Sequence, residues 1–169
     1  MKHLSFILVL LLVSVATTAC INNFAVQELN NNAKVYMDKG DVESAICRLK
    51  SSLELDSEVW ETHYNLATAY FNANKFQEAQ QEYQDAIKIN PELADAYYSL
   101  AVAYESHADF LLKNKEENES ANINVEDLFN SAISNYEIYI GKISSEQEIA
   151  EVQDRIASIK SLLVDNREN

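Results

Sequence analysis

The chain has 169 residues, 47% of them hydrophobic, with one proline and two glycines. So few helix-breaking residues, and apolar residues spaced three and four apart with no strand-like alternation, predict an all-α protein of one domain. The formal net charge of −14 would repel nucleic-acid phosphates, so we expect no nucleic-acid partner.

Residues 1–19 have the layout of a signal peptide. Lys2 precedes an apolar run, Leu4 to Val15, that is shorter than the roughly 20 residues of a membrane-spanning helix. Small residues then lead to Cys20. This ending resembles the lipobox of bacterial lipoproteins, although Thr17 stands where leucine is usual. The resemblance implies cleavage before Cys20 and lipidation of Cys20 by a diacylglyceryl group, with or without a third acyl chain such as palmitate.

Lipidation would place the protein at the cell membrane or the outer membrane, facing the periplasm or the cell exterior. The outer membrane is favoured in a bacterium with two membranes, because Ile21 replaces the aspartate of the inner-membrane retention signal. Residues 20–25 would then form a lipidated N-terminus and a short linker. Two alternatives remain: ordinary cleavage after Ala19 that releases a soluble secreted protein, and an uncleaved leader that serves as the anchor.

Lipidation of Cys20 would leave Cys47 as an unpaired cysteine in an oxidising compartment. Cys47 lies between Ile46 and Leu49 of a predicted helix. We therefore expect Cys47 to be a small buried apolar residue.

The rest of the chain repeats with a period of 34 residues. Residues 26–59 align with 60–93 without a gap, and a third copy, 94–140, keeps the register except for an insertion near 106–124. The aligned positions include these alanines and tyrosines: Ala33, Ala67, Ala101, Tyr36, Tyr70 and Tyr104. A fixed period of this length is typical of stacked helical repeats, so each copy should form a helix, a short turn and a second helix.

The second copy carries the most complete motif: Leu66-Ala67, Tyr70, Ala79, Tyr83, Ala86 and Pro91. It resembles the tetratricopeptide repeat (TPR) family, although alanine replaces the common glycine at 67 and His63 replaces the frequent tryptophan. The resemblance covers residues 26–165. It implies an all-α helical solenoid of about three helix pairs plus a C-terminal capping helix, in which the alanines let paired helices approach closely.

Local signals predict where helices begin and end. Gly40-Asp41 should form the turn within the first copy. Asn74 with Gln77 reads as a capping box for the next helix, and Asn90 should cap the following one with Pro91 at its first position.

The third copy continues its first helix through Leu111 into a polar stretch, 113–120, before Asn124 and Asp127 restart a helix. We expect a surface loop here, and the alternative is that it selects the partner. Gly141 should end that helix, and Ser144 with Gln147 should begin a last helix within 145–165. One face of it is apolar, as the capping helix of a solenoid requires: Ile149, Val152, Ile156, Ile159 and Leu163.

No catalytic constellation is evident. The chain has no glycine-rich phosphate loop, no serine elbow, no CxxC and no recognised spacing of metal ligands. We expect His63 to pack within its repeat and His107 to lie exposed. The prediction is therefore a non-enzymatic protein with no catalytic residue, no cofactor and no metal.

The resemblance implies that the first helix of each copy lines a concave groove that binds a protein partner. The residues at matching positions are Asn30, Lys34, Tyr64, Asn65, Thr68, Phe71, Tyr98, Val102 and Glu105. The alternative for Tyr64 and Phe71 is that they only fill the seam between repeats. Asp95 and Ser99 stand where the subtype that grips a chaperone's C-terminal carboxylate has basic residues, which argues against that subtype.

These features together predict a lipid-anchored envelope scaffold or adaptor that binds another protein through the groove. The alternative is a leader-anchored subunit that faces the cytoplasm and acts as a local chaperone or complex-assembly factor.

Overall fold

The computed structural model describes residues 22–114 and 123–168. The leader, Cys20 and most of the polar stretch after Lys113 lie outside the described residues. The described ranges contain seven helical segments and no strand, so the all-α prediction is confirmed. The segments are the first helix (residues 22–38), α2 (Val42–Leu55), α3 (Trp60–Asn72), α4 (Phe76–Ile89), α5 (Ala94–Lys113), α7 (Val125–Lys142) and α8 (Glu146–Glu168).

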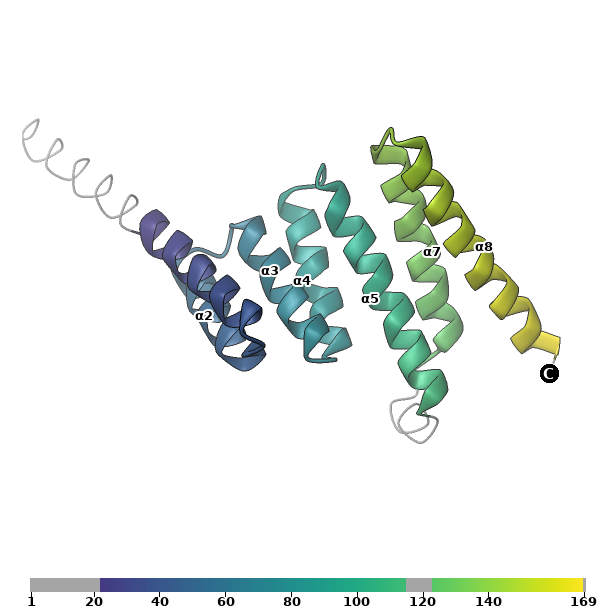
Figure 1. Ribbon diagram of the computed structural model, residues 1–169, viewed down its shortest axis with the longest axis horizontal. Helices are drawn as coiled ribbons and strands as arrows, with labels where there is room; N and C mark the ends of the chain where they lie inside the picture. The colour runs from purple at the N-terminus through teal and green to yellow at the C-terminus, as the bar shows by residue number, and fades with distance from the viewer. Residues whose placement is uncertain (1–21, 115–122, 169) are drawn as a thin grey trace, which may run out of the picture.

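The helices stand side by side in one row, with the first helix and α2 at one end and α8 at the other (Figure 1). The first helix pairs with α2, α3 with α4, and α5 with α7. The fold is therefore the predicted solenoid of three helix pairs with a capping helix. Within the described ranges, no helix is both long enough and apolar enough to cross a membrane.

The first two copies share the same backbone turn. Gly40 (φ 76°) and the aligned Asn74 (φ 56°) both adopt the left-handed conformation. Each turn closes with the same hydrogen bond, from Asp41 N–H to the Tyr36 carbonyl and from Lys75 N–H to the Tyr70 carbonyl, both at 2.9 Å. These bonds satisfy carbonyls left free at the end of a helix.

The predicted starts of two helices, α4 and α5, are wrong. Asn74 does not cap α4, because its left-handed backbone belongs to the turn, and Lys75 precedes the helix without a side-chain cap. Asn90 ends α4, and its Oδ1 instead accepts a hydrogen bond from Glu92 N–H at 3.3 Å. Pro91 lies in that turn, and α5 begins only at Ala94. The turn after α4 uses the residues that the sequence suggested would begin α5.

The boundaries nearer the C-terminus are closer to the prediction. Asn124 caps α7 as expected and accepts a hydrogen bond from Glu126 N–H at 3.0 Å. That helix continues through Gly141 to Lys142. The cap of α8 is Ser145 rather than Ser144, and its Oγ accepts from Glu148 N–H at 3.4 Å.

Small residues hold the helices together at the centre of the stack. Ala33, Ala67 and Ala101 are at most 1% exposed, as predicted. The buried residues form two clusters, one between the first two copies and α5 and one between α5, α7 and α8, and Tyr104 packs against both. In α8, Val152, Ile156 and Ile159 are buried, while Glu151, Asp154 and Lys160 face solvent. The last helix therefore covers the apolar end of the stack.

Cys47 is exposed, so the prediction of a buried cysteine is wrong. The buried face of α2 consists of Ala45, Ile46, Leu49 and Ser52. Successive residues of a helix are rotated by about 100°, and this rotation turns Cys47 away from the face that buries Ile46.

Candidate binding groove

A buried polar network fixes the side chains at the N-terminal end of the predicted groove. Asn30 of the first helix places its Nδ2 3.0 Å from Ser52 Oγ and 2.8 Å from Thr62 Oγ1. Ser52 and Thr62 are fully buried. Asn30 Oδ1 accepts a hydrogen bond from Asn65 Nδ2 at 3.1 Å. Because buried polar atoms must be paired, this network locks the first helix, α2 and α3 in register and positions Asn65.

A hollow of about 320 Å³ opens between the first helix and α3. Four predicted groove residues line it: Asn30, Lys34, Asn65 and Thr68. Leu49, Met37 and Ala33 supply apolar surface. Thr68 is held by hydrogen bonds to the Tyr64 carbonyl and to Tyr83 Oη, both at 3.0 Å.

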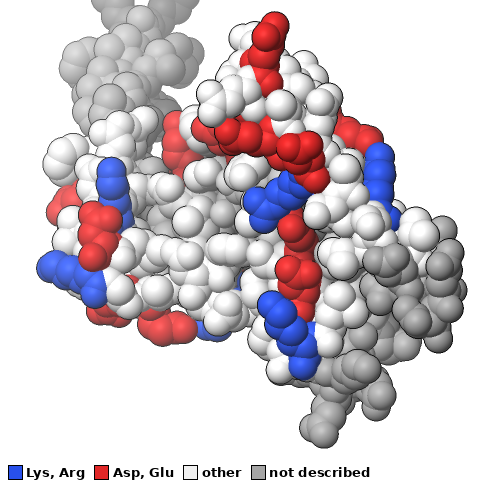
Figure 2. All heavy atoms as spheres, turned by 45° about the vertical axis from the view of Figure 1, so that its right-hand side comes forward, with Lys and Arg blue, Asp and Glu red and all other residues white. Residues whose placement is uncertain are grey.

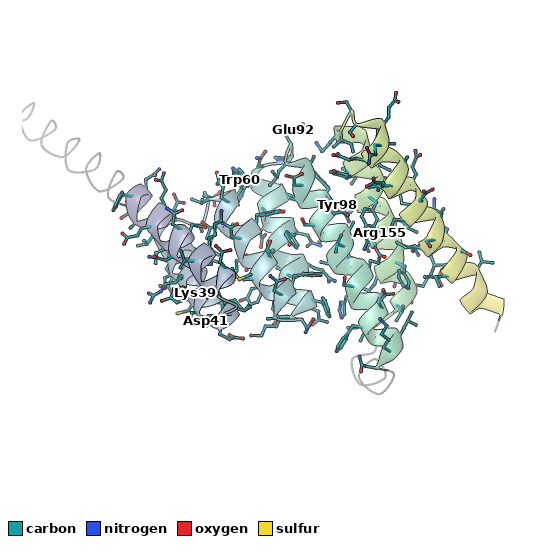
Figure 3. All side chains as sticks on the ribbon, viewed as in Figure 1. Lys39, Asp41, Trp60, Glu92, Tyr98 and Arg155 are labelled. Carbon is teal, nitrogen blue, oxygen red and sulfur yellow. The ribbon has the colours of Figure 1, made fainter. Side chains whose placement is uncertain are left out.

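A second hollow, of about 280 Å³, adjoins the first at Asn65. Trp60, Tyr64 and Leu93 give it apolar walls, and Glu61 and Asp95 give it two carboxylates. Figure 3 shows Trp60 at the beginning of α3. The Tyr64 hydroxyl lies 3.1 Å from Ser99 Oγ, and its ring meets Tyr83 edge to face. Tyr64 thus both lines a hollow and packs between repeats.

A third hollow, of about 440 Å³, lies at the N-terminal end of the stack. It shares Asn30 and Asn31 with the first hollow and Glu61 with the second. The three hollows therefore share lining residues over the first two copies and the beginning of α5, and we refer to them together as the depression.

The other four predicted groove residues make contacts inside the protein. The ring of Phe71 packs on Phe76 with centroids 5.9 Å apart. Tyr98 packs against Tyr136 and Tyr139 with centroids 5.6 and 5.1 Å away. Val102 is partly buried against the second cluster.

Glu105 joins α5 to both of the helices that follow. Its Oε2 accepts hydrogen bonds from Arg155 Nε at 2.7 Å and from the Tyr136 hydroxyl at 2.8 Å. Burial raises the pKa of Tyr136 well above its ordinary value, and the adjacent Glu105 raises that pKa further. Figure 3 shows Tyr98 and Arg155 at the end of the stack where α5, α7 and α8 gather. Five of the nine predicted residues therefore line the described hollows, and the other four are half-buried and make contacts inside the protein.

His107 is buried, at 6% exposure, so the prediction that it lies exposed is wrong. Its ring stacks on Phe76 of α4 with centroids 5.5 Å apart, and its Nδ1 lies 3.2 Å from Gln80 Nε2. Burial lowers the pKa of this imidazole, so the neutral form is favoured. The sequence held a signal for this, because His107 follows Leu100 and Ala103 along the apolar stripe of its helix.

The structure also brings together three side chains that no sequence spacing had singled out. His63 of α3 lies beside Glu82 and Asp85 of α4, with its Nδ1 2.7 Å from Glu82 Oε2. Its Nε2 lies 3.0 Å from the Ser57 carbonyl oxygen. The only hint in the sequence was the i, i+3 spacing of the two acids, which places them on one helical face.

Comparisons with known proteins agree with this architecture. Two family models match, one described as tetratricopeptide repeat over residues 30–79 and one described as TPR repeat over residues 68–107. A search of curated protein sequences found no significant match.

Solved structures with similar folds come from several sources. The crystal structure of MamA is 28% identical, with a TM-score of 0.64, covering 88% of this chain and 72% of that one. The first TPR of Spaghetti (RPAP3) bound to the HSP90 peptide SRMEEVD is 21% identical, with a TM-score of 0.61, covering 82% and 93%. The type III secretion translocator chaperone SycD of Yersinia enterocolitica is 14% identical, with a TM-score of 0.62, covering 80% and 83%. The chain therefore carries tetratricopeptide repeats within residues 30–107 and folds as a TPR-like helical solenoid.

Proposed function

We propose that this protein is a non-enzymatic scaffold, anchored by lipid on Cys20, that binds a segment of another protein in the depression over its first two copies. The observation that carries this proposal is that three neighbouring hollows share the lining residues Asn30, Glu61 and Asn65. A depression lined by amides, a lysine and aromatic rings offers hydrogen bonds and rigid apolar area to a peptide.

The chemistry of the depression favours a partner segment with a basic residue. Asn65 is exposed, and because its Nδ2 is used by Asn30, its Oδ1 is available to accept from a peptide N–H. The neighbouring hollow combines Glu61 and Asp95 with the rings of Trp60 and Tyr64. Carboxylates beside aromatic rings attract a lysine or arginine side chain through both charge and cation–π contact.

The Spaghetti structure supports peptide binding as the mode of action, since that TPR is bound to a peptide of HSP90. The peptide itself, SRMEEVD, has more acidic than basic side chains, and here it would meet Glu61 and Asp95. Like charges facing each other oppose binding. We therefore propose a groove of similar shape whose partner has the opposite charge.

The proposed anchor lies directly before the first helix. Residue 22 is already helical, so a lipid on Cys20 would hold the groove close to the membrane surface. Two or three acyl chains give stable attachment where one gives only reversible binding. The site of action would then be the cell envelope, at the cell membrane or the outer membrane.

The groove is tested by reversing its charge. We expect Glu61→Lys with Asp95→Lys to abolish binding of the partner that the wild type retains from host membranes after cross-linking, without unfolding the protein. The matched control reverses two exposed acids outside the depression, Glu78→Lys with Asp154→Lys, and should keep the partner. If the groove variant keeps every partner of the wild type, the proposed groove is wrong.

The anchor is tested by the intact mass of the protein from host membranes, beside a Cys20→Ser variant. The expected mass is that of residues 20–169 plus a diacylglyceryl group, with or without a third acyl chain. The variant should remain unlipidated. An unmodified full-length mass would contradict lipidation and favour the alternative of a leader-anchored subunit with a chaperone-like role facing the cytoplasm.

A further inference from the structure

We propose that His63, Glu82 and Asp85 form a binding site for a divalent transition-metal ion, with Zn²⁺ the best match. Their candidate ligand atoms all lie within 4.8 Å of one another. The site joins α3 to α4 and is separate from the open groove residues. The proposal of a metal site does not depend on whether the groove binds a partner.

The hydrogen bonds of His63 orient one ring nitrogen as a ligand. Its Nε2 lies 3.0 Å from the carbonyl oxygen of Ser57, and a carbonyl oxygen can pair only with a protonated nitrogen. In a neutral imidazole Nδ1 is then unprotonated and directs its lone pair at Glu82 Oε2, 2.7 Å away. An N–H bonded to a backbone carbonyl is also the arrangement that orients metal-bound histidines.

Two acceptor atoms at 2.7 Å repel unless a cation lies between or beside them. A proton on either group satisfies this need, and so does a metal ion. The side chains of His63 and Glu82 are only 12% and 20% exposed, so water screens the pair weakly. The second carboxylate, that of Asp85, favours a metal ion over a proton. One proton can bridge only two acceptor atoms, whereas a metal ion can bind all three groups.

The carboxylates are positioned by α4. Glu82 and Asp85 are three residues apart and share a helical face. Gln81 Nε2 donates to Asp85 Oδ2 at 3.1 Å, which leaves Oδ1 available as a ligand. Lys50 interacts electrostatically with Glu82, but its ammonium lies over the Tyr70 ring, 5.7 Å from the centroid. In the described residues no ion pair joins Lys50 to Glu82.

One imidazole nitrogen and two carboxylate oxygens suit zinc, which takes three protein ligands and a water when a fourth position is open. Calcium and magnesium prefer ligand sets made only of oxygen. Zinc–ligand bonds of about 2.0–2.2 Å in tetrahedral geometry put neighbouring ligands about 3.3–3.6 Å apart. Binding would therefore require the Nδ1–Oε2 pair to widen from 2.7 Å. The bound ion would link α3, α4 and, through Ser57, the turn that precedes α3.

The test titrates the full-length protein with Co²⁺ and then displaces Co²⁺ with Zn²⁺, following the visible absorption of cobalt. We expect one ion per chain, and no thiolate-to-cobalt charge-transfer band in the near ultraviolet. Asp85→Asn and His63→Ala should each weaken binding by at least about tenfold, since loss of even a supporting partner of a ligand costs about 10–100-fold. Glu78→Gln, on an exposed site of the same helix, is the charge-matched control and should bind like the wild type.

Three results would overturn the proposal. One is a wild type that binds neither ion at millimolar concentration, which would leave a proton as the cation between His63 and Glu82. Another is binding with a thiolate band, which would assign the metal to cysteine. The third is binding that both variants retain. If His63→Ala fails to fold, Asp85→Asn decides the question, because the partly exposed Asp85 is not part of a buried cluster.

Discussion

Single alanines determine how closely the paired helices of this protein approach. Ala67 and Ala101 have no exposed surface, and Ala33 is 1% exposed. A longer side chain at these positions would have to displace a neighbouring helix or bury its polar end. Interiors packed this densely tolerate neither change well.

Ala67→Glu should lower the free energy of unfolding by roughly 3 kcal/mol or more, because it buries a carboxylate without a partner. Ala157→Glu is the matched control, since Ala157 is exposed on α8. Thermal melts followed by circular dichroism measure both. Equal melting temperatures for the two variants would show that Ala67 does not lie in a helix seam.

His107 should make stability depend on pH. Burial lowers its pKa in the folded state below the ordinary histidine value of about 6.5, so below about pH 6.5 the unfolded chain binds a proton that the folded chain does not. The stability present above that pH is lost as the pH falls through the folded pKa, by at most about 1.4 kcal/mol per pH unit.

Urea titrations of the wild type and of His107→Gln between pH 7.5 and about pH 5 isolate this contribution. The wild type should lose more stability on acidification than the variant, because glutamine does not titrate. Parallel pH profiles for the two proteins would mean that His107 is accessible to water in the folded state.

At the scale of elements, the turns between paired helices repeat every 34 residues, as the helices do. Gly40 and Asn74 occupy the same left-handed position, which glycine adopts without strain and asparagine adopts more readily than most residues. The second glycine, Gly141, is inside α7. Apart from atoms of the adjacent backbone, a Cβ would meet nothing within 4 Å at either glycine, so the two sites differ in backbone conformation and not in the space around them.

Alanine substitutions should therefore have opposite effects at the two glycines. Gly40→Ala should destabilise the protein by about 1–2 kcal/mol, because a Cβ is strained at φ 76°. Gly141→Ala should stabilise it by up to about 1 kcal/mol, because alanine loses less backbone entropy in a helix. Chemical denaturation of both variants measures the change in the free energy of unfolding. A loss of stability in Gly141→Ala would contradict the assignment of Gly141 to a helix.

At the scale of the whole molecule, the stack has two ends of different character. The first helix exposes Phe24 and Val35, at 69% and 47%, whereas α8 buries one apolar face against the stack and exposes Leu162 and Val164, at 45% and 53%, near the C-terminal end of the helix. Asp and Glu cover more of the face shown in Figure 2 than Lys and Arg do, in keeping with the net charge of −14. Such a surface favours solubility and basic partners over nucleic acids.

Because repeats contact only their neighbours, local stability should fall toward the ends of the stack. We expect amide hydrogens of α3 and α4 to exchange more slowly than those of α8, which packs on one side only through Val152, Ile156 and Ile159. Hydrogen exchange followed by mass spectrometry measures this order. Equal protection in all helices would indicate that the whole stack opens as one unit.

Much of the architecture follows from the sequence because it depends on local periodicity. The alignment of Ala33 with Ala67, and of Tyr36 with Tyr70, predicted the helix pairs, and the apolar stripe of Val152, Ile156 and Ile159 predicted the capping helix. The wrong predictions concern the residue at which a helix begins and the side of a helix on which a residue lies. Asn74 is a residue type that often caps helices, but its backbone adopts the left-handed conformation of a turn. Cys47 directly follows the buried Ile46, and the rotation of the helix from one residue to the next leaves Cys47 exposed.

The amino-acid sequence by itself determined the repeat, the all-helical fold and the order of the helix pairs, because these follow from spacing along the chain. Only the tertiary structure decided which of the nine groove residues face the open depression, since Glu105 and Tyr98 are engaged by α7 and α8, which come later in the chain. Only the tertiary structure placed His63 beside Glu82 and Asp85. The physical reason is that such contacts depend on how neighbouring helices are rotated and packed, and no period in the sequence specifies that rotation.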